Sequence, residues 1–175
     1  MTASPLGELV DGRVRRHCPK GTQEYAFRSS ITLTLEGDMT LTGRCLCGAV
    51  RWESVEPPIT TRVCWCRDCQ YLGAGSGTVG ACFRTAAFKV TGTTSDYLSV
   101  ADSGNRMHRR FCPRCGTPLF SEAEARPHLV FVRVGTFDDP ELAKPAMTIW
   151  TSSAPTWACI SDVAPRVEKQ PPAAA

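Results

Sequence analysis

The sequence lacks the features that mark membrane, secreted or nucleic-acid-binding proteins. No apolar stretch approaches the roughly 20 residues that span a bilayer. Glu8, Asp11 and Arg13 interrupt the N-terminus, where a secretory signal would need an apolar core. The formal net charge is only +3, which is too small to indicate a nucleic-acid-binding surface with clustered lysine and arginine. We therefore expect neither a membrane nor a nucleic acid as a partner.

Histidine is also scarce, and no repeat of fixed period is visible. The chain has three histidines. His108 and His128 fall in the region with strand-like patterning, but neither has the spacing of a metal ligand. The 175 residues, of which 42% are hydrophobic and 21% charged, suit one globular domain, or one domain with a tail.

Residues 1–38 differ from the rest of the chain. Five acidic residues balance five basic ones in this segment, and no helical or strand period is sustained. The first convincing strand begins at Leu41, directly after Met39. We predict that residues 1–38 are a poorly ordered N-terminal extension, that 39–170 form one β domain, and that the Pro- and Ala-rich end, 171–175, is a frayed tail. His17 and Cys18 could ligate a metal, but we interpret them as part of the solvated extension.

From Leu41 onward, short runs rich in β-branched and aromatic residues alternate with Gly, Pro and Asp. Two short helical turns are expected at 68–72 and 139–143. The pattern predicts a mainly β fold, a partly open barrel or folded sheet in which metals hold loops together. The predicted strands are 41–44, 49–53, 60–64, 78–83, 88–91, 95–100, 106–111, 118–121, 128–135 and 147–150.

Cysteine is abundant, with ten in the chain. Seven fall into three tight groups, which are Cys45 with Cys47, then Cys64, Cys66 and Cys69, then Cys112 with Cys115. Ten cysteines also allow a disulfide scaffold in an oxidising compartment. However, C-x-C and C-x-x-C groups are typical of zinc chelation and poorly suited to several long-range bridges. The spacing therefore favours metal over disulfides, and with it a reducing, cytoplasmic location.

Seven clustered cysteines divide naturally into four and three. The two outer doublets close a four-thiolate structural zinc site, made of Cys45, Cys47, Cys112 and Cys115. Each doublet is followed by a glycine. Gly48 and Gly116 can adopt positive φ and turn backbone N–H groups toward the negatively charged sulfurs.

The middle group, Cys64, Cys66 and Cys69, predicts a zinc with an open position. Residues two apart in a strand share a face, and a turn can bring the third cysteine beside them. Three protein ligands leave the fourth position for water or a substrate thiol. The alternative is a second structural zinc completed by Cys82 or another distant residue.

A substrate thiolate at this site would raise the negative charge and call for nearby cations. No general acid or base is identified from the sequence. The arginines placed to supply positive charge are Arg62, Arg67, Arg109 and Arg110, of which Arg67 and Arg110 are the candidate catalytic residues.

Five stretches of the chain are similar to one family. They are GRCLCGAVRW at 43–52, VCWCRDC at 63–69, RRFCPRCGTPLF at 109–120, TIWTSSAPTW at 148–157 and DVAPRVEKQP at 162–171. From about Thr40 to Pro171 the chain resembles the glutathione-dependent formaldehyde-activating enzymes and their centromere-protein-V-like relatives. Many members carry histidine between the first two cysteines of the middle group, where this chain has Trp65.

The resemblance implies a β-tent fold with two zincs, a structural one on Cys45, Cys47, Cys112 and Cys115 and a catalytic one on Cys64, Cys66 and Cys69. Family members are classed as carbon–sulfur lyases that join or release glutathione and formaldehyde as S-hydroxymethylglutathione. We therefore predict a zinc-dependent carbon–sulfur lyase with two zincs per chain, acting on a thiol adduct of a small carbonyl compound. Its predicted partner is a small-molecule thiol such as glutathione. The alternative is a non-catalytic, zinc-stabilised binding module.

Overall fold

The computed structural model describes residues 9–10, 13–14 and 40–171. Two strands of two residues each, β1 (Leu9–Val10) and β2 (Arg13–Val14), pair as a separate antiparallel hairpin. The remaining strands are β3 (Leu41–Arg44), β4 (Arg51–Ser54), β5 (Thr60–Cys64), β6 (Thr78–Arg84), β7 (Phe88–Thr91), β8 (Ser95–Val100), β9 (Arg106–Phe111), β10 (Pro118–Ala123), β11 (Leu129–Arg133) and β12 (Met147–Ile149). The α-helix is α1 (Arg67–Leu72), and the 3-10 turns are η1 (Thr85–Ala87), η2 (Val134–Thr136), η3 (Pro140–Ala143) and η4 (Thr151–Ser153).

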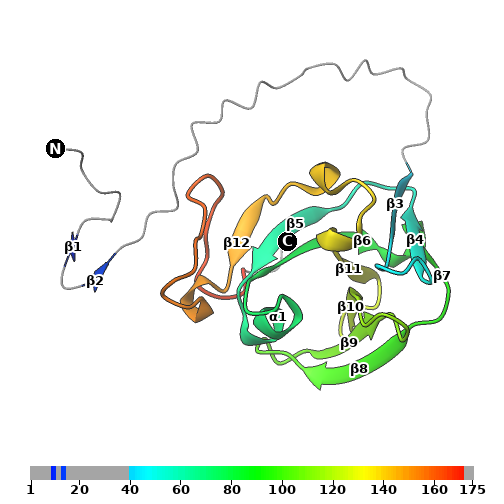
Figure 1. Cartoon of the computed structure of the whole chain (residues 1–175), viewed down its shortest axis with the longest axis horizontal. Coiled ribbons are helices and arrows are strands. Elements are labelled where there is room, and N and C mark those ends of the chain that lie inside the picture. Colours follow the sequence, from blue (N-terminus) through cyan, green and yellow to red (C-terminus); the bar gives the residue numbers. More distant parts are fainter. Residues whose placement is uncertain (1–8, 11–12, 15–39, 172–175) are drawn as a thin grey trace, which may run out of the picture.

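Two sheets build the domain. The larger has seven strands in the order β12-β5-β6-β11-β10-β9-β8, and the smaller has three in the order β3-β4-β7. Every pair is antiparallel except β12 with β5. In Figure 1 the small sheet lies at the opposite side of the domain from β12 and α1. The mainly β prediction is confirmed, and within residues 40–171 the strands close no barrel, since β12 and β8 are the two ends of an open sheet.

The hydrophobic core lies between the two sheets, and it is built from every second residue of the strands. On β6, Ala81 and Phe83 are buried in the core, and on β11, Val130 and Val132 are. Because successive strand residues point to opposite faces, the residues between them face the other side of the large sheet. That second face holds the candidate site.

Trp52 of β4 joins the small sheet to this core. Its ring packs edge-on against Phe137, with centroids 4.6 Å apart, and its Nε1 donates to Thr136 Oγ1 at 3.0 Å. Gly43 of β3 lies so close to this ring that a Cβ there would sit 2.4 Å from it and 2.2 Å from the Thr136 carbonyl oxygen. Glycine is therefore required at this position by the close approach of the indole ring.

Most predicted strands match the structure within one or two residues, and five of them match at both ends, namely 41–44, 60–64, 88–91, 95–100 and 106–111. The segment predicted as strand 128–135 is shorter. It ends at Arg133, because Val134–Thr136 forms the turn η2 that delivers Thr136 to Trp52. The predicted helical turns correspond to α1 and η3.

The ends of the chain are described only in part. The predicted extension at 1–38, with His17 and Cys18, lies almost entirely outside the described residues, as does the predicted tail after Pro171. Among the helices that the structure describes, none has the length and apolar character needed to cross a membrane.

Candidate metal centres

Four cysteines from two distant loops converge on one point. Cys45 and Cys47 lie between β3 and β4, and Cys112 and Cys115 lie between β9 and β10. Their four sulfurs lie within 4.8 Å of one another, and the Cys45–Cys47 and Cys47–Cys112 sulfur pairs are 3.5 and 3.8 Å apart. A tetrahedral ion about 2.3 Å from each sulfur requires separations of about 3.8 Å. The group therefore fits a tetrahedral divalent ion.

The backbone around this group has the expected glycine turns. Gly48 has φ of 74° and Gly116 has φ of 73°, which favours glycine at both positions. Their N–H groups donate to the carbonyl oxygens of Cys45 and Cys112, each at 2.9 Å, and not to sulfur as the sequence had suggested. The N–H of Val50 instead donates to Cys45 Sγ at 3.3 Å. The glycines thus shape the turns, while a neighbouring residue supplies the donor.

The remaining three clustered cysteines form a second group on the other face of the large sheet. Cys64 ends β5, Cys66 precedes α1 and Cys69 lies within it. Their sulfurs lie within 4.8 Å of one another, and no described His, Cys, Asp or Glu joins them as a fourth ligand. Cys82 is buried and is not part of the group. None of these cysteines is in a disulfide.

Hydrogen bonds among the three thiols shift their pKa values in opposite directions. The Cys64 and Cys66 thiols lower the pKa of Cys69 to about 2 by hydrogen bonding to its sulfur. The pKa of Cys64 is raised, first by its hydrogen bonds to Cys66 and Cys69 and then by burial. Among the three sulfurs, Cys69 is therefore the one whose thiolate form the hydrogen bonds favour.

A cavity opens directly over this group. Its empty space is about 740 Å³, part of which is open solvent. Its lining includes the three cysteines together with Thr78, Gly80, Phe131, Ile149 and Trp150. The alternation of side chains along each strand explains why these residues line one cavity. Arg62 and Cys64 share one face of β5, and Phe131 and Arg133 share one face of β11.

Four arginines line the same cavity, which are Arg62, Arg109, Arg126 and Arg133. Arg133 Nη2 donates to Ser121 Oγ at 2.9 Å. Burial lowers the pKa of Arg133, and the Cys69 thiol opposes that shift because its thiolate attracts the guanidinium. Arg109 is buried and pairs with Asp68 at 2.5 Å. Burial raises the pKa of Asp68, while Arg109 acts against that shift.

Arg67 and Arg110, the two arginines singled out from the sequence, do not line this cavity. The Arg67 guanidinium donates to Gln70 and lies 5.4 Å from the centre of the Tyr71 ring. Arg110 lies on the face of β9 opposite Arg109 and pairs with Asp96 and Glu122.

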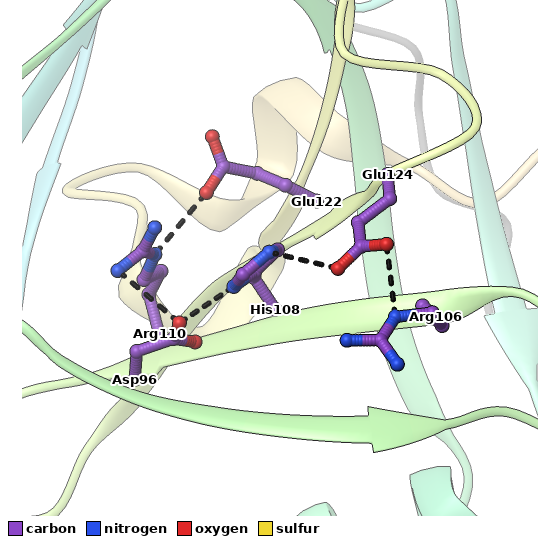
Figure 2. A network of polar contacts seen from close by, with 6 residues as sticks. All are labelled: Asp96, Arg106, His108, Arg110, Glu122 and Glu124. Atoms are coloured by element: carbon purple, nitrogen blue, oxygen red, sulfur yellow. Dashed lines mark hydrogen bonds and ion pairs between the residues drawn. The ribbon is translucent and has the colours of Figure 1, made fainter.

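Arg110 belongs to a polar network that also contains a histidine (Figure 2). His108 Nδ1 lies 2.6 Å from Asp96 Oδ2, and its Nε2 lies 3.6 Å from Glu124, which also pairs with Arg106. Since Met107 and Arg109 line the cavity, alternation along β9 places His108 on the other face. This histidine therefore does not reach the three-cysteine group.

The C-terminal segment builds one wall of the cavity. Trp150 has φ of 58°, a left-handed conformation that is uncommon for a bulky residue. Its N–H donates to the Lys169 carbonyl at 3.3 Å, and its Nε1 lies 3.4 Å from the side-chain oxygen of Gln170, which also lines the cavity. In the same C-terminal segment, the N–H of Val167 donates to the carbonyl of Thr148 in β12. Contacts with residues 165–170 thus hold the Trp150 backbone in this conformation.

Sequence reasoning missed Arg126 and Arg133. Arg133 ends the run LVFVR at 129–133, in which Val130 and Val132 are core residues. A charged residue at an alternate position of an otherwise apolar strand was the available signal for Arg133. Arg126 lies in the turn before β11, and no sequence pattern indicated it.

One known family matches the part of the chain that holds both cysteine groups. The model of the glutathione-dependent formaldehyde-activating enzyme family matches residues 40–153. A Rhodobacter sphaeroides protein of known crystal structure is similar at 22% identity, with a TM-score of 0.45, over 55% of this chain and 87% of that one. No curated protein matches. This match covers both cysteine groups and every residue that lines the cavity except Gln170, so the chain belongs to the glutathione-dependent formaldehyde-activating enzyme family.

Proposed function

We propose that this chain is a zinc-dependent carbon–sulfur lyase that acts on the adduct of a glutathione-type thiol and a small carbonyl compound. The observation that carries the proposal is the three-sulfur group with no fourth ligand among residues 40–171, opening onto a cavity. A closed structural site would have four protein ligands, whereas three are typical of a catalytic zinc. The four-cysteine group is assigned to a structural zinc.

The Cys64, Cys66 and Cys69 thiolates would hold the catalytic ion, and Cys45, Cys47, Cys112 and Cys115 the structural one. Zinc at the three-cysteine site would supply a coordination position for the substrate sulfur and lower the pKa of that thiol. We further propose a cytoplasmic location, where the thiols of both groups, which are free in the structure, would stay reduced.

Breaking the carbon–sulfur bond of a hydroxymethyl thioether leaves the electron pair on sulfur, while the hydroxyl loses its proton to give the carbonyl. A fourth thiolate would make the formal charge of the site more negative, from −1 to −2. Arg133 is suited to offset that charge, since it lines the cavity and the Cys69 thiolate opposes the burial-driven fall in its pKa. A metal-bound thiolate of low pKa is a weaker nucleophile, so stabilising the leaving sulfur is the role that we assign to the site.

Cobalt substitution tests the proposal. Co²⁺ in the three-cysteine group should change its visible spectrum when glutathione is added, and the loaded zinc protein should accelerate exchange between formaldehyde and its glutathione adduct. A spectrum that does not respond to glutathione would support the alternative, a non-catalytic, zinc-stabilised binding module. A spectral response without any turnover would retain thiol binding but remove the lyase assignment.

A further inference from the structure

Two of the arginines that line the cavity lie over one aromatic ring. The guanidinium carbons of Arg62 and Arg126 are each 5.6 Å from the centre of the Phe131 ring. All three residues line the cavity, and Phe131 lies across the large sheet from Cys82, whose other neighbour is Thr60 of β5. Both guanidiniums thus lie within cation–π distance of one ring at the cavity surface.

These cations have no anionic partner in the part of the chain that the structure describes. By contrast, three arginines of β9 each pair with a carboxylate, namely Arg106, Arg109 and Arg110. No described Asp or Glu lies within ion-pair distance of Arg62 or Arg126, and the buried Nε of Arg62 has no hydrogen-bond acceptor. A carboxylate at this place would accept a hydrogen bond from the unpaired Nε of Arg62 and would offset the two positive charges.

We propose that Arg62 and Arg126 form a carboxylate-binding subsite that selects thiols carrying a carboxylate group. The guanidinium fork matches a carboxylate with two parallel hydrogen bonds. The inference rests on the proposed function, in which the sulfur of the same substrate binds at the three-cysteine group. Arg62 and Cys64 are two residues apart on one face of β5, a separation of about 7 Å, which one small peptide-like thiol can span.

The subsite is tested by calorimetric titration of the zinc-loaded protein with three probes. S-methylglutathione keeps both carboxylates but cannot bind metal as a thiolate, cysteamine is a thiol without a carboxylate, and glutathione has both groups. We expect Arg62→Gln and Arg126→Gln each to weaken S-methylglutathione binding by about tenfold or more. Cysteamine affinity should stay unchanged in both variants, and Arg126→Lys should recover part of the loss.

Arg106→Gln is the matched control, since Arg106 lies outside the cavity and should leave all three affinities unchanged. Circular dichroism would verify that each variant is folded. Failure of S-methylglutathione to bind the wild-type protein, equal affinities in wild type and both glutamine variants, or an equal loss for cysteamine would each overturn the subsite.

The two proposals can fail separately. Arginine-dependent binding of S-methylglutathione, combined with a cobalt spectrum that ignores glutathione, would support the subsite and reject thiol coordination. A cobalt spectrum that responds to glutathione equally in wild type and both glutamine variants would support thiol coordination and reject the subsite.

Discussion

Cys66 occupies the junction between β5 and α1, and the residue is only 8% exposed. Its backbone is extended, with φ of −59° and ψ of 158°, and its carbonyl accepts the N–H of Gln70 in the first turn of α1. The side chain of Gln70 in turn donates to the carbonyls of Trp65 and Ser153. Hydrogen bonds to its own backbone and to Ser153 therefore help to fix the loop that carries the cysteines.

Replacing Cys66 with alanine should remove one metal and leave the fold intact. We expect the zinc content to fall from two to about one per chain, because a two-thiolate remnant binds weakly while the hydrogen bonds of Gln70 persist. Metal analysis together with circular dichroism measures both quantities. Cys82→Ala is the matched control, since Cys82 is buried but outside the group. Loss of a zinc in Cys82→Ala would mean that this residue completes the site, and the catalytic proposal would then be wrong.

At the scale of the elements, the small sheet β3-β4-β7 depends on close packing around one indole ring. Trp52 contacts Phe83, Phe88 and Phe137, with centroids between 4.6 and 6.1 Å apart. The approach of Gly43 to this ring leaves no space for a side chain. The sheet thus attaches to the core through contacts that tolerate little change in volume.

Gly43→Ala should therefore destabilise the protein by about 1–3 kcal/mol, the usual cost of overpacking a core. Urea denaturation would show this as a lower midpoint with an unchanged slope. Gly135→Ala is the control, because a Cβ at Gly135 meets nothing within 4 Å, and its effect should stay within about 0.5 kcal/mol. Equal midpoints for the two variants would contradict the role given to Gly43.

At the scale of the whole molecule, the two cysteine groups differ in which parts of the chain they connect. The four-cysteine group joins the loop after β3, in the small sheet, to the loop after β9, in the large one. Cys45 and Cys112 are buried within the hydrophobic core itself. Structural zinc contributes on the order of 10–16 kcal/mol in peptides, as much as the whole stability of a typical domain, about 5–15 kcal/mol. The three-cysteine group instead lies within one continuous segment, from β5 to α1.

Cys112→Ala should consequently unfold the domain or make it insoluble, in contrast to Cys66→Ala. Stepwise removal of zinc with a strong chelator should release one ion first without unfolding and the second together with loss of structure. Parallel measurement of released zinc and of circular dichroism follows both steps. Simultaneous loss of both ions with the fold would argue against separate structural and catalytic centres.

The amino-acid sequence by itself determined the grouping of the cysteines and the positions of most strands. Local spacing brings Cys64, Cys66 and Cys69 together, because residues a few positions apart cannot separate far. The same is true within each outer doublet, and their pairing followed from counting thiolates. The tertiary structure decided which arginines line the cavity over the three-cysteine group. These arginines come from distant segments of the chain, and they are Arg62, Arg109, Arg126 and Arg133. Only the register of the paired strands and the packing of the connecting turns bring them to one cavity.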